Sequence, residues 1–118
     1  MTGLADRRCV ACAKGTPPLS KEAQSELGAD IPNWENVDGV KLRREYRFKS
    51  YLAGVAWVQQ VGEIAELEDH HPEIKILYRK VQIEVWTHTV NGLSDNDYIL
   101  AAKLDRAYEE KRGGDSSR

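Results

Sequence analysis

Apolar residues recur along the chain at regular steps, and these steps predict its helices. Over residues 50–69 they recur every three or four positions, as on the buried stripe of an amphipathic helix. Pro72 follows this stretch and cannot continue a helical ladder. A short helix is expected over 21–27, behind a candidate N-cap at Ser20, and a last helix over about 95–111.

Alternation between apolar and polar residues predicts strands elsewhere, although Arg44 interrupts the apolar parity of Leu42, Tyr46 and Phe48. The alternating segments span residues 34–37, 40–48, 73–78 and 81–88. Asp38-Gly39 between the first two is a strong signal for a two-residue hairpin. Arg79-Lys80 joins the second pair, although neither residue favours the positive φ of a tight hairpin.

The last of these segments has two chemically different faces. Its odd-numbered residues from Val81 to Thr87 form an apolar row, whereas His88 lies on the opposite face. His88 is therefore expected to point away from the layer of side chains that packs on the helices.

These elements predict an α+β fold in the order α-β-β-α-β-β-α. Two hairpins and three amphipathic helices favour a two-layer structure, with a four-stranded antiparallel sheet that carries the helices on one face. We expect an N-terminal arm over 1–18, a single domain over 19–112 and a flexible tail over 113–118.

Composition and charge narrow the class of protein. The 118 residues are 41% hydrophobic and 31% charged, with a formal net charge of −2 and no concentrated block of basic residues. Nothing in this balance indicates nucleic-acid binding. No apolar run approaches the length of a membrane span, and the first residues lack the apolar core of a signal peptide. We therefore expect a cytoplasmic protein with neither nucleic acid nor membrane as a partner.

The two cysteines, Cys9 and Cys12, form a single Cys-x-x-Cys motif in the arm. Such a motif is half of a zinc site, but no second Cys or His pair follows at finger spacing. It also lacks the strand-to-helix setting of a redox motif. The simpler interpretation is two reduced thiols.

All three histidines of the chain, His70, His71 and His88, fall within a stretch of nineteen residues. Histidine is the side chain that exchanges protons most readily near neutral pH. Glu66 precedes His70 by four residues, so both are expected on one face of the last helical turn. The cluster therefore predicts a site for acid–base chemistry.

Two other interpretations of the histidines stay open. A histidine at a helix C-terminus can serve only to stabilise the helix dipole. A three-histidine metal site is also conceivable, but His70 and His71 are neighbours, which project about 100° apart on a helix.

Asp97 likewise has two interpretations. Ser94 and Asp97 have the spacing of a capping box, in which the Asp97 carboxylate reaches back to the Ser94 N–H. Alternatively, Asp97 orients or charges an imidazole.

The spacing of these residues resembles the pterin-4a-carbinolamine dehydratase family. The pattern is Glu66, three residues, His70-His71-Pro72, five residues to Tyr78, nine more to His88 and eight more to Asp97. The resemblance covers about residues 19–110 and extends to Trp34, Tyr46-Arg47-Phe48, Thr87-His88, Gly92-Leu93-Ser94 and Asn96-Asp97. Asn96 differs from the arginine of mammalian-type members.

The resemblance implies a saddle-like sheet, a homodimer or homotetramer, and loss of water from a 4a-hydroxytetrahydropterin to give a quinonoid dihydropterin. It implies no metal and no organic cofactor, because the pterin is the substrate. His70, His71 and His88 would be the catalytic residues. Glu66 and Asp97 would support them, and Trp34 would lie near the edge of the pocket.

The resemblance also implies a metabolic role for the reaction and an alternative, non-catalytic function. The reaction would support pterin recycling for aromatic amino acid hydroxylation, with an aromatic amino acid hydroxylase as a possible partner. Some relatives instead act as dimerisation cofactors or assembly factors, so a non-catalytic binding role is the alternative.

Overall fold

The structure, a computed structural model, describes residues 3–10 and 15–115, with side chains up to residue 110. It has the predicted order of elements: α1 (Lys21–Gly28), β1 (Glu35–Val37), β2 (Lys41–Arg47), α2 (Tyr51–Glu68), β3 (Glu73–Leu77), β4 (Lys80–Val85) and α3 (Asp95–Asp115). Two short 3-10 turns, η1 (Leu4–Asp6) and η2 (His88–Val90), complete the description.

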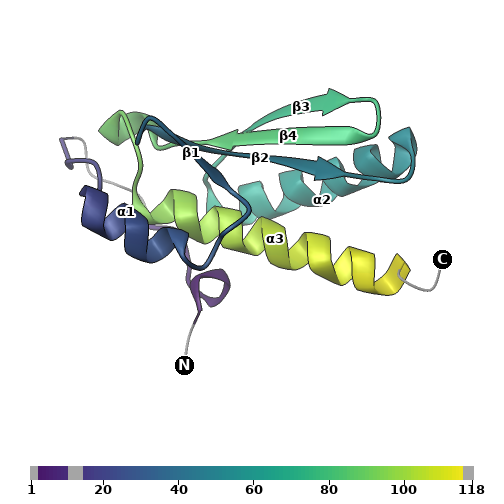
Figure 1. The fold of residues 1–118 in the computed structure, drawn as a ribbon, viewed down its shortest axis with the longest axis horizontal. Helices are drawn as coiled ribbons and strands as arrows, with labels where there is room; N and C mark the ends of the chain where they lie inside the picture. Colours follow the sequence, from purple (N-terminus) through teal and green to yellow (C-terminus); the bar gives the residue numbers. More distant parts are fainter. Residues whose placement is uncertain (1–2, 11–14, 116–118) are drawn as a thin grey trace.

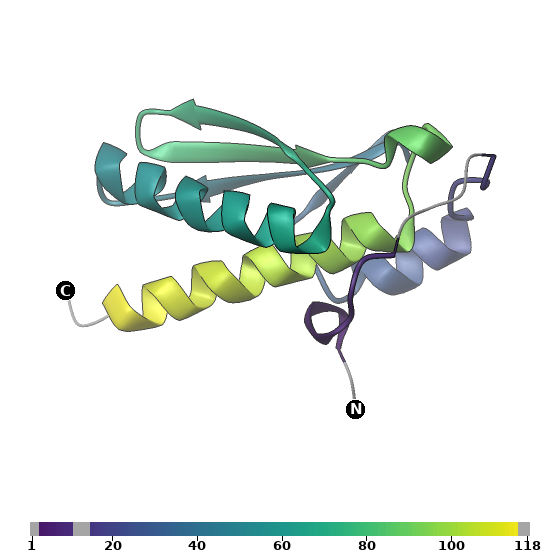
Figure 2. The same cartoon turned by 180° about the vertical axis from the view of Figure 1, so that it is seen from behind.

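The four strands form one antiparallel sheet with the order β1-β2-β4-β3. All three α-helices lie on the same face of this sheet, with α2 and α3 side by side and α1 beside the first half of α3 (Figures 1 and 2). The two-layer α+β fold expected from the sequence is thus confirmed.

The core lies between the sheet and the helices. From the sheet it receives the inward row of β4, where Val81, Ile83 and Val85 are fully buried. From the helices it receives Trp57 of α2 and Leu104 of α3, which are also fully buried. The alternating pattern of β4 is therefore the pattern of a strand with one face on the core.

The sequence located the cap of α1 and the position of the first hairpin correctly. The Ser20 side chain accepts a hydrogen bond from Ala23 N–H at 3.2 Å and begins α1. Asp38 and Gly39 both have positive φ, 55° and 74°, as a type I′ hairpin turn requires. The ladder resumes with Val37 opposite Lys41, so three residues rather than the expected two separate the strands, and β2 begins one residue later than predicted.

The second hairpin differs from the prediction by one residue. Leu77 pairs with Lys80, so the turn consists of Tyr78 and Arg79 rather than Arg79-Lys80. Tyr78 takes up the positive φ, 57°. Lys80 is needed in the ladder, where it also pairs with Arg47 of β2.

The two elements next to the histidines are shorter than predicted. Helix α2 ends at Glu68, because Asp69 adopts the left-handed conformation with φ 51°. Strand β4 ends at Val85, and His88 begins η2 instead of closing the strand. Only an isolated bridge between Thr87 and Gly92 continues the extended backbone. At the other end of the chain, α3 continues to Asp115, past the predicted Lys111.

The N-terminal arm is docked along α3. Leu4 is buried in the core, and the carbonyl oxygen of Ala5 accepts hydrogen bonds from Lys103 and Arg106. Within residues 3–10 the arm is therefore part of the packed structure. Cys12 lies outside the described residues.

Candidate active site

The end of α2 separates the two adjacent histidines. At Asp69 the backbone turns left-handed, and the N–H of His70 still donates to the carbonyl oxygen of Ala65 at 3.1 Å. His70 and His71 therefore follow the helix rather than belonging to it, and each finds its own carboxylate partner.

His70 is held by Asp97 from the first turn of α3. The distance from His70 Nε2 to Asp97 Oδ1 is 2.6 Å, and the side chains are 12% and 0% exposed. A carboxylate only accepts hydrogen bonds, so Nε2 donates to it and Nδ1 is left as the nitrogen that can face a substrate. The pair unites residues 27 positions apart in the sequence.

Asp97 fulfils both roles that its spacing allows, one with each oxygen. Oδ1 binds His70, whereas Oδ2 accepts from the Ser94 N–H and from the Thr87 hydroxyl, both at 2.9 Å. The Thr87 and Ser94 hydroxyls are 2.6 Å apart. The capping box thus fixes the carboxylate that orients His70.

His71 pairs with Glu66 at the surface. The distance from His71 Nε2 to Glu66 Oε2 is 2.5 Å, and the side chains are 55% and 78% exposed. The expectation that Glu66 shares a helix face with His70 is therefore wrong. The helix ends before His70, and the left-handed turn at Asp69 brings His71 instead of His70 back to Glu66.

His88 is exposed at the start of η2, on the outer side of the strand end as expected. Its ring lies 4.7 Å from the Trp86 ring, centroid to centroid. The intervening Thr87 is buried and binds Asp97. One strand end therefore carries His88 outward and, one residue earlier, fixes the carboxylate that holds His70.

Trp34 does not join this cluster in the structure. It is buried, and its Nε1–H donates to Asp105 Oδ1 at 2.9 Å. The same oxygen accepts from Arg44 at 2.6 Å and from the Tyr46 hydroxyl at 2.5 Å. Asp105 of α3 thus links Trp34 to Arg44 and Tyr46 of β2. It also gives the N–H of the buried indole the hydrogen-bond partner that it needs.

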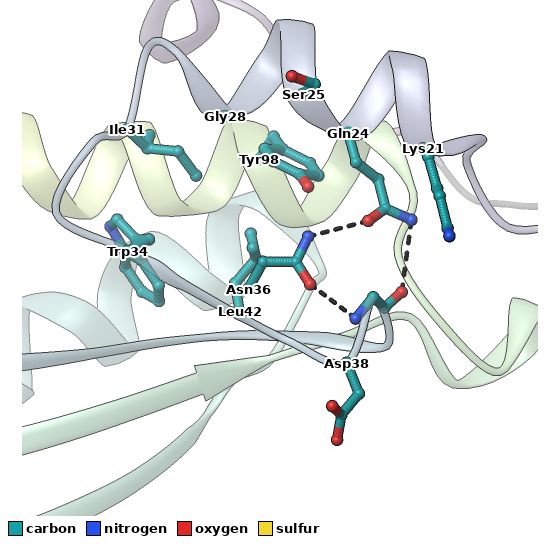
Figure 3. A pocket seen from close by; sticks show the side chains of 11 residues that line it. Lys21, Gln24, Ser25, Gly28, Ile31, Trp34, Asn36, Asp38, Leu42 and Tyr98 are labelled. Atoms are coloured by element: carbon teal, nitrogen blue, oxygen red, sulfur yellow. Dashed lines mark hydrogen bonds between the residues drawn. The ribbon is translucent and has the colours of Figure 1, made fainter.

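Trp34 also lines a pocket of about 510 Å³ between α1 and the β1–β2 hairpin (Figure 3). None of the three histidines lines this pocket. Its polar side chains bind one another: Asn36 donates to Gln24, Gln24 donates to the carbonyl oxygen of Gly39, and Gly39 N–H donates to Asn36. These bonds tie the hairpin turn to α1.

The Tyr98 hydroxyl points toward this network (Figure 3). It is buried and makes no hydrogen bond of ordinary geometry to the described residues. Burial raises the pKa of Tyr98, the neighbouring Asp97 charge raises it further, and the Asn36 amide opposes both. Tyr98 therefore stays neutral beside Asp97.

The arm approaches the site from the other side of α3. The Asn96 side chain accepts from Val10 N–H at 2.9 Å and donates to the Val10 carbonyl oxygen at 2.6 Å. Glu68, at the end of α2, accepts from Cys9 N–H at 2.8 Å. The arm is thus fixed to the residues next to Asp97 and His70.

Charge and burial shift the pKa values of Glu68 and Cys9, which lie where the arm contacts the end of α2. Burial opposes ionisation of Glu68, but the Cys9 N–H and the Lys103 ammonium outweigh it and lower the Glu68 pKa. Burial, together with the Glu68 charge, raises the pKa of Cys9 to about 12. The Cys9 thiol is therefore protonated at neutral pH and a poor nucleophile.

Sequence reasoning missed Thr87 and Trp86 as parts of the site. Thr87 carries the clearer signal, because it is a polar residue on the apolar parity of β4 and its continuation. A buried hydroxyl needs a partner, and Asp97 is that partner. Trp86 lies on the outer parity, where a large aromatic ring among Gln82 and Glu84 is unusual.

Within residues 3–10 and 15–110, no three His, Cys, Asp or Glu side chains are grouped so that they could hold a metal ion. Within the same residues, no helix combines the length and the apolar character that a membrane span requires.

Comparison with known proteins relates this arrangement to one family. A family model described as pterin 4 alpha carbinolamine dehydratase matches residues 17–107. A protein of Rubrobacter xylanophilus, provisionally named a pterin-4-alpha-carbinolamine dehydratase, is 42% identical over 106 residues, which are 90% of this chain and 99% of that protein. A protein of the same provisional name from Chlorobium luteolum is 41% identical over 113 residues, with 93% and 99% of the chains covered.

A solved structure also resembles the fold. The crystal structure of a transcriptional coactivator/pterin dehydratase from Brucella melitensis superposes with a TM-score of 0.73 at 28% sequence identity. The match covers 77% of this chain and 98% of that chain.

Proposed function

This chain belongs to the pterin 4 alpha carbinolamine dehydratase family, a family of lyases, and we propose that it removes water from a 4a-hydroxytetrahydropterin. The product is the quinonoid dihydropterin. The observation that supports this reaction best is the pairing of adjacent histidines with separate carboxylates, His70 with Asp97 and His71 with Glu66. His88 stands at the strand end that also fixes Asp97.

The reaction needs one proton delivered and one removed. The hydroxyl at C4a is a poor leaving group and departs as water once it accepts a proton. The N5–H bond then breaks, its electron pair forms the C4a=N5 double bond, and the proton passes to a base. Groups that titrate near neutral pH are suited to both transfers, and a positioned group of this kind contributes about 10²- to 10⁴-fold in rate.

We assign the transfers to the histidines as follows. His70 and His88 act on the departing hydroxyl and its proton. His71 serves the opposite transfer or binds the pterin ring. Asp97 orients His70, and Glu66 acts on His71, which revises the pairing expected from the sequence. No metal ion or organic cofactor takes part in this scheme.

The same proposal includes a biological setting. The dehydratase would recycle the pterin that aromatic amino acid hydroxylases leave hydroxylated, in the cytoplasm, as a homodimer or homotetramer. Two features support self-association. Leu52 and Leu67 of α2 are 73% and 74% exposed, and β3 lies at the edge of the sheet with β4 as its one partner among the described strands.

A spectroscopic assay tests the reaction. The carbinolamine is generated in situ, and its dehydration is followed with and without the protein. We expect the wild type to accelerate dehydration over buffer, and His70→Ala and His88→Ala each to lose about 10²- to 10⁴-fold in kcat while their circular dichroism stays that of the wild type. A wild-type rate equal to that of buffer would refute the proposed activity. Full activity in His88→Ala would remove that residue from the scheme.

A second candidate function is binding of another protein without catalysis. It is favoured by the exposed apolar residues of α2, and the Brucella melitensis protein is named a coactivator as well as a dehydratase. Gel filtration of the purified chain with a purified hydroxylase, before and after Leu52→Asp/Leu67→Asp, separates the two roles. Loss of a complex with dehydratase activity retained would establish a distinct binding surface.

A further inference from the structure

Trp86 and His88 lie on the same outer side of the end of β4. The residue between them, Thr87, is extended, with φ −105° and ψ 109°. In an extended backbone, residues two apart project to the same face. The two rings accordingly meet, with centroids 4.7 Å apart and planes inclined at 45°.

His88 differs from the other histidines in what restrains it. His70 and His71 each bind a carboxylate. Among residues 3–10 and 15–110, no side chain or backbone group hydrogen-bonds the His88 imidazole, which is exposed. The Trp86 ring contacts the imidazole and restricts the rotamers that it can adopt.

Trp86 itself is well anchored. Its ring is half-buried, and the Lys41 ammonium lies 5.5 Å from the ring centroid. Lys41 in turn binds Glu84 at 3.1 Å, and Glu84 binds Arg43 at 2.6 Å. The contacts from Arg43 through Glu84 to Lys41 thus link β2 to β4 and restrain the indole of Trp86. The His88 ring also contacts this indole.

We propose that Trp86 is a positioning residue for His88, and that its ring keeps the imidazole in the orientation that proton transfer requires. This inference rests on the proposed function, because it assumes that His88 reacts. A catalytic group on an exposed turn that samples several rotamers spends little time in the reactive one, and small displacements of such groups cost up to about 10²-fold. The indole supplies at His88 the restraint that Asp97 supplies at His70.

The test compares Trp86→Ala, which removes the ring, with Trp86→Phe, which keeps one. We expect Trp86→Ala to lower kcat about 10- to 100-fold with KM nearly unchanged, and Trp86→Phe to retain most of the activity. Tyr51→Ala is the matched control, because Tyr51 is an exposed aromatic residue at the start of α2. It should leave both constants unchanged.

A second readout does not depend on activity. The indole ring current displaces the NMR signals of the His88 ring protons, and Trp86→Ala should return them to the positions of an unstructured histidine. Trp86→Phe should retain part of the displacement. If Trp86→Ala leaves these signals in place, the contact does not exist in solution and the inference is overturned, even if the wild type proves inactive as a dehydratase.

A double-mutant cycle shows whether Trp86 acts through His88. In a His88→Ala background, Trp86→Ala should cause no further loss of kcat. A full additional loss, a rise in KM with unchanged kcat, or an equal loss in Trp86→Phe and Trp86→Ala would mean that the indole binds substrate itself, and each would overturn the positioning role.

Discussion

Asp97 holds His70 from a fully buried position: its Oδ1 lies 2.6 Å from His70 Nε2, while its Oδ2 accepts two further hydrogen bonds from Thr87 and Ser94. The carboxylate is therefore an acceptor on every side. A substitution that replaces one of its oxygens with a hydrogen-bond donor would place that donor against the groups that now donate to Asp97. We therefore expect Asp97 to affect stability and function together.

Asp97→Asn should consequently lower both the stability of the fold and the rate of dehydration. The new amide NH₂ faces either the Ser94 N–H, which cannot accept a hydrogen bond, or His70 Nε2, which accepts one only when the imidazole proton moves to Nδ1 and the tautomer is reversed. We expect the free energy of unfolding to fall by about 1–3 kcal/mol and kcat to fall by about 10- to 100-fold. Asp95→Asn is the control in the same helical turn. Asp95 is half-exposed and binds only Arg7 among the described side chains, so stability should change by less than about 0.5 kcal/mol. Equal effects of both substitutions would contradict the buried role of Asp97.

Glu66→Gln should affect function more than stability. Glu66 and His71 form an exposed pair, and such pairs contribute little to the free energy of unfolding and are screened by salt. Denaturant titration should give a stability within about 0.5 kcal/mol of the wild type. The rate of dehydration should drop a few-fold at low salt, with a smaller deficit at high salt. A deficit that is independent of salt would argue against a charge effect on His71.

Glu68→Gln should destabilise the protein in a pH-dependent way. In the folded protein the pKa of Glu68 is lowered from its usual 4.5. The Glu68 charge thus contributes stability that is present above pH 4.5 and is lost as the pH falls through the folded pKa. The variant should be about 1 kcal/mol less stable at pH 7, and the difference should shrink below pH 4.5. Glu63→Gln, on the exposed side of the same helix, should show no such narrowing.

Cys9 should react slowly with thiol reagents in the native protein. Its pKa, about 12, leaves roughly 10³-fold less thiolate at pH 8 than an ordinary cysteine has. In a Cys12→Ser background, disulfide exchange with Ellman's reagent should be slow until denaturant is added. Glu68→Gln should accelerate it, because the Glu68 charge is one cause of the raised pKa. A fast native reaction would mean that the arm is undocked in solution.

Local signals in the sequence were sufficient for most of the fold. The position of the hairpin at Asp38-Gly39, the cap at Ser20 and the bond from the Ser94 N–H to Asp97 are decided by residues within three positions of one another, and the structure confirms these three features. Alternation in β4 likewise reports the side of the strand that is buried, without any knowledge of the elements that cover it.

The partners of the histidines could not be assigned in this way. The left-handed residue Asp69 changes the partner of Glu66 from His70 to His71, and an aspartate indicates that conformation less strongly than a glycine does. The partner of His70 lies 27 residues away and becomes visible only when α3 is placed beside the end of α2. Trp34 lines a pocket that contains none of the histidines, and its indole N–H binds Asp105, 71 residues away.

The strand end from Val85 to His88 also constrains how this protein can vary in length. The Thr87 side chain points inward and binds Asp97, whereas Trp86 and His88 point outward and contact each other. The number of residues in this segment therefore decides whether each side chain faces the core or the outside. An insertion or deletion of one residue here would turn the histidine inward and the threonine outward. Natural length variation should therefore be absent from residues 85–88.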